Sequence, residues 1–149
     1  MSELAITQEE GDRLFQMEKF FKEAETLVFP DFGGKLTFNF VSFDGRELFT
    51  LNFTKNSINL VKRNHQIRGR RVIGLARLDL YGPSHRNPDG TEIGSNHIHI
   101  YREGFGLKWA CEIPAEHFSD IGDQIKTLED FMSYCNVVDP PSISRGLFS

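Results

Sequence analysis

Cysteine and long apolar runs are both scarce in this sequence of 149 residues. Cys111 and Cys135 are the two cysteines, and because they lack CxxC spacing we expect two unpaired thiols in the core. No run approaches the roughly 20 apolar residues of a transmembrane helix. The first residues also lack a basic segment followed by an apolar one, which a secretion signal would have. We therefore expect a cytoplasmic protein with no membrane partner.

Acidic residues are missing from the middle of the chain. Leu48 to Leu78 contains no Asp or Glu, whereas residues 1–30 and residues 112–139 carry seven acids each, and the net charge is −4. Such a distribution gives a positive face, unless the acidic segments fold back and neutralise it. The residues predicted to bind nucleic acid are Lys62, Arg63, Arg68, Arg70, Arg71, Arg77 and, further along, Arg86.

Tryptophan and tyrosine are also rare, with one Trp and three Tyr against 14 Phe, so we expect a core built on phenylalanine. The length is that of one domain. We predict a single domain over residues 1–149, in which residues 139–149 form a frayed tail.

The hydrophobic spacing predicts helices at both ends of the chain. Thr7 and Glu10 have the spacing of a capping box, and apolar residues then recur every three or four positions as far as Val28. This predicts a helix of about five turns, ended near Pro30. A short C-terminal helix is predicted over residues 128–135, with Thr127 as its N-cap.

Between these helices the apolar residues alternate with polar ones, which is typical of strands. Strands are predicted at 35–43, 46–54, 57–63, 71–81, 98–102 and 107–113, and Asp44-Gly45 is a hairpin turn signal. The predicted fold class is α+β. A twisted antiparallel sheet of about six strands packs on the long N-terminal helix, and the short C-terminal helix completes the core.

The most site-like feature is the polar loop that leads into the strand His97-Ile98-His99-Ile100-Tyr101. Side chains two apart on a strand share a face, so His97, His99 and Tyr101 are expected on one side. If this strand pairs with residues 71–81, that face meets Arg77 and Asp79. The loop adds His85 and Arg86, and His65 is expected on the same side of the sheet.

Three roles suit these residues. The first is metal-independent RNA cleavage, in which His97 and His99 are the acid–base pair. The catalytic candidates are then His97, His99, His85 and Tyr101, with Arg77 and Arg86 contacting the phosphate, and no cofactor is needed. The second role is metal binding, for which the candidate ligands are His97, His99, His85 and Asp79. The third is structural, with the histidines hydrogen-bonded on a half-buried face.

Two motifs carry a resemblance to a known family. Gly82-Pro83-Ser84-His85-Arg86-Asn87-Pro88-Asp89-Gly90, followed by the segment from His97 to Gly106 (HIHIYREGFG), resembles a bacterial family found in mobile elements and phages. The loop and the H-x-H strand are more distantly similar to small toxins of the TumE type. That similarity implies an antitoxin partner and an RNA or translation target.

We therefore predict an RNA-directed, toxin-like protein of a mobile element that acts on RNA or a ribonucleoprotein. Whether it is an enzyme stays open at this point. The alternative is a non-enzymatic binding protein, such as an inhibitor of a host defence complex that processes nucleic acid.

Overall fold

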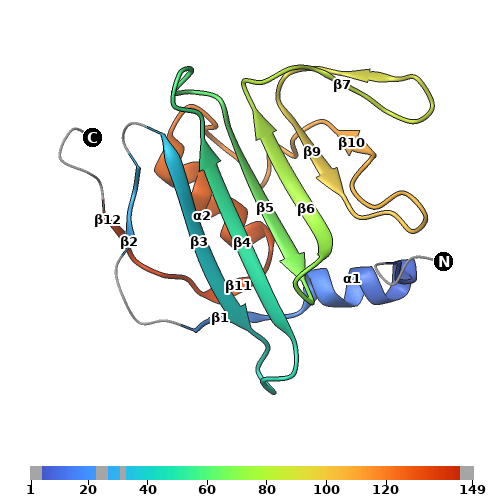
Figure 1. Ribbon diagram of the computed structural model, residues 1–149, viewed down its shortest axis with the longest axis vertical. Helices are drawn as coiled ribbons and strands as arrows, with labels where there is room; N and C mark the ends of the chain where they lie inside the picture. The colour runs from blue at the N-terminus through green and yellow to red at the C-terminus, as the bar shows by residue number, and fades with distance from the viewer. Residues whose placement is uncertain (1–4, 23–26, 31–32, 145–149) are drawn as a thin grey trace.

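A computed structural model of the protein describes residues 5–22, 27–30 and 33–144 (Figure 1). Within these ranges the chain is a mixed α+β structure with two helices, one large sheet and two small ones. The elements are α1 (Gln8–Gln16), β1 (Lys19–Phe21), β2 (Leu27–Val28), β3 (Gly34–Val41), β4 (Leu48–Lys55), β5 (Arg63–Gly69), β6 (Ile73–Leu80), β7 (His85–Arg86), β8 (Glu92–Ile93), β9 (His97–Ile100), β10 (Ala110–Cys111), α2 (Gln124–Tyr134), β11 (Val137–Asp139) and β12 (Ile143–Ser144).

The large sheet formed by the described residues has eight strands in the order β10-β9-β6-β5-β4-β3-β1-β11. From β10 to β1 every neighbouring pair is antiparallel, as predicted, whereas β1 and β11 are parallel. The sheet is thus larger than the predicted six strands. Of the additional strands, β1 lies in the segment that was predicted as the N-terminal helix, and β11 lies just after the predicted C-terminal helix, with only Asp139 in the predicted tail.

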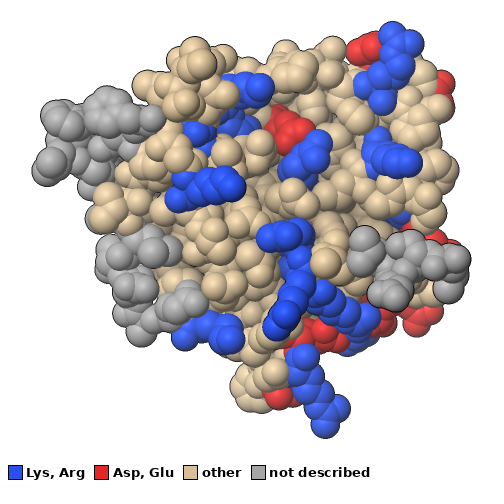
Figure 2. All heavy atoms as spheres, viewed as in Figure 1, with Lys and Arg blue, Asp and Glu red and all other residues tan. Residues whose placement is uncertain are grey.

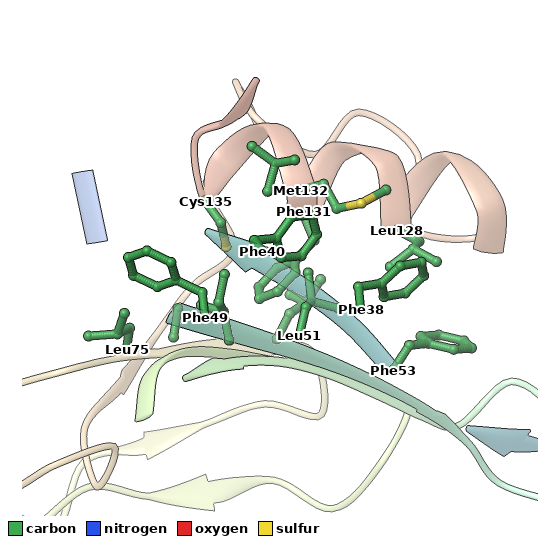
Figure 3. Close-up of a cluster of buried hydrophobic side chains, with 14 of the residues drawn as sticks. Phe38, Phe40, Phe49, Leu51, Phe53, Leu75, Leu128, Phe131, Met132 and Cys135 are labelled. Carbon is green, nitrogen blue, oxygen red and sulfur yellow. The ribbon is translucent and has the colours of Figure 1, made fainter. Parts of the chain in front are cut away.

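The core lies between α2 and one face of the sheet. Every second side chain of β4 is buried on this face, as are Phe38 and Phe40 of β3, as the alternation predicts. Figure 3 shows the phenylalanine rings of these strands on the side of the sheet that faces α2, and their burial confirms a core built on phenylalanine. The labelled core residues of these three elements are Phe38, Phe40, Phe49, Leu51, Phe53, Leu128, Phe131 and Met132.

The N-terminal helix is short, which corrects the prediction of five turns. Thr7 is its N-cap as predicted, but α1 ends at Gln16 and Met17 already has extended backbone. In a longer helix the Phe15 carbonyl would accept the Lys19 N–H. Here the Lys19 N–H donates to the Asn136 carbonyl (3.0 Å), and the Lys19 ammonium donates to the Phe15 carbonyl (2.7 Å). Residues 23–26 of the predicted helix lie outside the described residues.

The third strand is also displaced from its prediction. Residues 57–62 connect β4 to β5, and the polar segment predicted as a connection is β5 itself. The core-facing positions of β5 include Arg63 and His65, so its sequence does not look like a buried strand. The apolar segment before it was misleading, because Ile58 is 94% exposed.

Three smaller corrections concern the C-terminal half. α2 begins at Gln124 with Asp123, not Thr127, as its N-cap. Part of the predicted frayed tail is ordered, since β12 pairs with β2, while residues 145–149 lie outside the described residues. Cys135 is buried as predicted, but Cys111 is exposed because β10 forms an edge of the sheet.

Neither described helix is long and apolar enough to cross a membrane.

The face of the sheet opposite α2 is not covered by either described helix (Figure 1). We call it the open face. Most of its side chains on the four central strands are polar, and they are half-buried or exposed. They include Thr37, Asn39, Thr50, Asn52, Thr54, Asn64, Gln66, Arg68, Arg77 and Asp79.

Candidate functional site

The open face ends at a group of polar side chains on β6 and β9. These strands are antiparallel, with Asp79 opposite His97 and Arg77 opposite His99. The pairing assumed from the sequence is therefore correct, and it brings Arg77, Asp79, His97 and His99 together. We call Asp79, His85, His97 and His99 the histidine cluster.

Backbone carbonyls fix the tautomers of the two strand histidines. His97 Nδ1 lies 2.6 Å from the Gly94 carbonyl oxygen, and His99 Nδ1 lies 2.7 Å from that of Leu107. A carbonyl oxygen only accepts, so both Nδ1 atoms must carry a proton and donate. In a neutral ring the Nε2 atom is then left with a free lone pair.

Both Nε2 atoms point at the same carboxylate oxygen. Asp79 Oδ2 lies 3.3 Å from His97 Nε2 and 3.1 Å from His99 Nε2. The two rings are almost fully buried, with exposed fractions of 2% and 1%, whereas Asp79 is only half-buried. Ligand atoms of the three residues all lie within 4.8 Å of one another, close enough to hold a metal ion.

Arg77 completes the charge balance of the cluster. Its Nε donates to Asp79 Oδ1 (3.0 Å) and its Nη2 to Oδ2 (3.0 Å), and Nη2 also lies 3.1 Å from His99 Nε2. Burial raises the pKa of Asp79, but the contact with His99 and the hydrogen bonds and charge of Arg77 outweigh it and lower the pKa to about 2. Asp79 is therefore a carboxylate at neutral pH.

His85 reaches the cluster from the loop between β6 and β9. Its ring lies 4.6 Å from the His99 ring and 5.7 Å from the His97 ring, centroid to centroid. His85 Nε2 donates to the Lys108 carbonyl (2.8 Å), so its Nδ1 is an acceptor in the neutral ring. This atom is not among the ligand atoms grouped with Asp79, which separates His85 from the inner three residues.

Asn87 is the residue that holds this loop in place, and the sequence interpretation missed it. The motif Asn87-Pro88-Asp89-Gly90 forms a turn, but the Asn87 side chain is buried. Its amide donates to the Ala110 carbonyl (2.9 Å) and accepts the Ala110 N–H (2.8 Å), so it bonds to β10 as a strand would. The signal was present in the motif, where asparagine is usually attributed to the turn alone.

Tyr101 and His65 do not join the cluster. The Tyr101 hydroxyl donates to the Ile6 carbonyl (2.5 Å), and its ring lies against Gly11 of α1. His65 lies opposite Leu78 in the sheet and faces the core, since its ring packs against Phe53. Side chains alternate along β5, so His65 faces the core while its neighbours Asn64 and Gln66 face the open side.

Three of the predicted nucleic-acid-binding residues lie on or beside the open face. Arg68 donates to the Asn52 side chain (2.7 Å) at its centre, Arg77 stands next to Asp79, and Lys62 lies at one end. Figure 2 shows Lys and Arg side chains spread over this side of the molecule, with few acids between them.

Two other predicted contacts are engaged in ion pairs. Arg70 pairs with Glu10 of α1 (2.5 Å) and with Glu47 (2.9 Å), and Arg86 pairs with Glu92 (2.9 Å). The acidic N-terminal helix thus neutralises one end of the basic segment, which is the alternative that the charge distribution left open.

The last two predicted contacts differ in their access to solvent. Arg63 is buried, and its guanidinium donates to the carbonyls of Val61 (2.8 Å) and Ile121. Arg71 is exposed in the β5–β6 turn, where its φ is 70°.

Two adjoining hollows mark the open face. One, of about 350 Å³, is lined by Lys35, Asn52, Thr54, Asn64, Gln66 and Arg68. The other, of about 320 Å³, is lined by Lys62, Arg63, Asn64, Gln66, Arg77, Asp79, Leu80, Gly82 and Pro83. Asp79 is the one acid in the two described linings, and it already pairs with Arg77. The hollows therefore form a polar, net positive surface that leads to the histidine cluster.

Comparison with known proteins gives one match. A family model described as a family of unknown function (DUF6978) matches residues 6–137, from the residue before the Thr7 cap to the first residue of β11. Neither a curated protein nor a solved structure matches the chain.

Proposed function

The chain belongs to the family of unknown function DUF6978, and from that premise we propose that it is an RNA-directed protein that binds the RNA backbone on its open face. The observation that carries the proposal is the pair of net positive hollows that end at the histidine cluster. The proposal thereby assigns the function predicted from the sequence to one surface of the molecule.

The chemistry of the lining favours backbone contacts over base recognition. Cations and side-chain amides bind phosphates and ribose hydroxyls, whereas bases of single strands are usually stacked on aromatic rings. None of the described residues that line the two hollows is aromatic. We therefore expect RNA binding with little dependence on sequence.

The cluster is placed where a bound phosphodiester would meet it. Arg77 and Asp79 line the second hollow, and Arg77 bridges that hollow to His99. In the enzymatic form of the proposal, Arg77 stabilises charge on the phosphate and the cluster cleaves the ester. A toxin-like role in the cell stays a prediction from the resemblance.

A non-enzymatic binding protein is the second candidate, and the burial of the rings favours it. His97 and His99 are buried, and each of their nitrogens is directed at a protein oxygen. An acid–base pair must instead reach the substrate, directly or through one water. The proposal thus has two forms, which share the open face and differ in whether bound RNA is cut.

Fluorescence anisotropy with a short labelled single-stranded RNA tests the shared part. We expect Lys35→Gln/Arg68→Gln to weaken binding at least tenfold. The control Arg46→Gln, an exposed cation at the β3–β4 turn, should bind like the wild type. Equal affinity of all three proteins would rule out the open face as the RNA site.

The same RNA, separated on a denaturing gel after incubation, distinguishes the two forms. Cleavage that Asp79→Asn abolishes while binding persists would identify an enzyme. Bound but intact RNA would identify the binding protein.

A further inference from the structure

The inner three residues of the cluster have an unusual arrangement of acceptors. His97 Nε2, His99 Nε2 and the Asp79 carboxylate converge, and in neutral rings all three groups are acceptors that repel one another. A cation between them removes this repulsion. We propose that His97, His99 and Asp79 bind one divalent transition-metal ion, a role that goes beyond RNA binding and does not rest on it.

The distances suit such an ion. In a tetrahedral site with metal–ligand bonds near 2.0–2.1 Å, two ligand atoms are about 3.3 Å apart. Asp79 Oδ2 lies 3.3 Å from His97 Nε2 and 3.1 Å from His99 Nε2, so both separations are already close to that value. These two separations therefore need little change, and the third, between the two Nε2 atoms, lies within 4.8 Å.

The surroundings of the two imidazoles are those of metal ligands. A ligating histidine almost always donates its other ring N–H to a carbonyl or carboxylate, which fixes the ring and leaves the ligating nitrogen unprotonated. The Gly94 and Leu107 carbonyls do this for His97 and His99. Rings that are 1–2% exposed are also held by packing, so the site is preorganised.

Arg77 shows where a cation is favoured and how the ion reaches its site. Its Nη2 lies 3.0 Å from Asp79 Oδ2 and 3.1 Å from His99 Nε2, on the side of the second hollow. The Arg77 side chain is 36% exposed and lines the second hollow, so the ion would take the place of its guanidinium beside Asp79 Oδ2 as that group moves into the hollow. The coordination positions left by three protein ligands would then face the open side.

Two imidazoles and one carboxylate select the kind of metal. Imidazole nitrogen suits Zn²⁺, Fe²⁺ and Co²⁺, whereas Mg²⁺ and Ca²⁺ prefer sites made entirely of oxygen. Three protein ligands with an open position are also the arrangement of catalytic zinc sites. We therefore expect binding of Zn²⁺ and Co²⁺ and none of Mg²⁺ at the same concentration.

The test is a titration of metal-free protein, with any affinity tag removed, by Zn²⁺ in a calorimeter and by Co²⁺ in a spectrophotometer. We expect one equivalent of each ion, a visible Co²⁺ absorption band typical of a four- or five-coordinate site, and a higher Tm with Zn²⁺. His97→Gln, His99→Gln and Asp79→Asn should each weaken Zn²⁺ binding by 100-fold or more. His117→Gln, which changes an exposed histidine outside the cluster, is the matched control and should stay within about threefold of the wild type.

Two results would overturn the assignment. One is folded wild-type protein that takes up no stoichiometric Zn²⁺ or Co²⁺. The other is a His117→Gln variant that loses as much affinity as His99→Gln. If the ligand variants fail to fold, X-ray absorption at the zinc edge of the wild type decides, because the site requires two imidazoles on the metal. Since these measurements use no RNA, they separate this inference from the proposed function.

Discussion

At the scale of single residues, the two kinds of buried histidine in this protein have opposite surroundings. His97 and His99 face a carboxylate and two carbonyls, whereas His65 lies among apolar rings, 4.9 Å from Phe53 and 5.5 Å from Phe131. Burial, and to a lesser extent the charge of Arg63, lowers the pKa of His65 to about 3, and the Leu78 backbone offsets little of this. His65 is therefore neutral in the folded protein.

This neutral histidine makes the protein sensitive to acid. Unfolded, His65 has a pKa of about 6.5, so between that pH and the folded value of about 3 the unfolded chain binds one more proton. The free energy of unfolding then falls as the pH drops below about 6.5, by at most about 1.4 kcal/mol per pH unit. We expect His65→Leu to remove this part of the dependence. It should also raise stability near pH 7 by about 1–2 kcal/mol, because it deletes poorly bonded buried nitrogens.

Urea unfolding at several pH values between about 7 and 4 measures this dependence. His117→Gln, which changes an exposed histidine, serves as the control and should keep the wild-type dependence. A His65→Leu protein that loses stability in acid as steeply as the wild type would show that another group is responsible.

Particular residues also show how much of the candidate site could be predicted from the sequence. The alternation of β6 and β9 correctly placed Arg77 and Asp79 beside His97 and His99. It could not place Tyr101, which follows the end of β9 and turns to α1, nor the carbonyls that orient the rings. Backbone partners of a side chain depend on the path of loops, which side-chain periodicity does not encode.

At the scale of elements, α1 is held by a close contact between its backbone and Tyr101. A Cβ atom on Gly11 would lie 2.6 Å from Tyr101 Cδ2, and the ring is held because its hydroxyl bonds both backbone polar groups of Ile6. Gly11→Ala gains about 1 kcal/mol in helix propensity, but the overlap costs about 1–3 kcal/mol. We expect a net loss of stability.

A double-mutant cycle measured by urea unfolding checks this origin. In a Tyr101→Leu background the ring is absent, so Gly11→Ala should become neutral or stabilising. An equal loss in both backgrounds would place the cause elsewhere.

Lys19 ties the ends of the two helices together. Its side chain is fully buried, and its ammonium donates to the carbonyls of Phe15 (2.7 Å), Met17 (2.9 Å) and Cys135 (2.6 Å), at the C-terminal ends of α1 and α2. Lys19→Met keeps most of the volume but leaves these carbonyls without their donor, so we expect a loss of about 2–4 kcal/mol. Thermal unfolding of this variant beside Lys22→Met, an exposed neighbour, measures it. Similar Tm values for the two variants would contradict the role of the ammonium.

The elements that could be predicted are those whose partners are local. The Thr7 cap and the Asp44-Gly45 turn were correct, because both depend on bonds within a few residues. The end of α1 and the start of β5 were wrong, since they depend on Lys19 and on Arg63, which face the interior and bond to distant carbonyls. Burial of charged side chains is the common reason.

At the scale of the whole molecule, charge is separated although the net charge is −4. The acids of α1 neutralise Arg70 at one end of the sheet, while Lys35, Lys62, Arg68 and Arg77 remain on the open side. An RNA strand on this face would therefore meet a positive surface, even though the net charge of the whole protein is negative and would repel it.

Salt dependence tests this separation. If four cations each contact a phosphate, the logarithm of Kd should rise with the logarithm of salt concentration with a slope of about 3. Arg68→Gln should reduce that slope by about 0.7–1, whereas Arg46→Gln should leave it unchanged. Anisotropy titrations over a series of salt concentrations measure the slope. A slope near zero for the wild type would mean that binding does not use these cations.

The bond between Lys19 and Cys135 joins groups 116 residues apart in the sequence, and the parallel pairing of β1 with β11 crosses a similar distance. During synthesis on the ribosome, the hairpins from β3 to β6 need only nearby residues and can form early. β1 has no partner on its other side, and the Lys19 ammonium lacks one of its acceptors, until α2 and β11 have emerged. The nascent chain thus exposes an unpaired sheet edge for most of its translation, and this is the interval in which we expect it to need a chaperone.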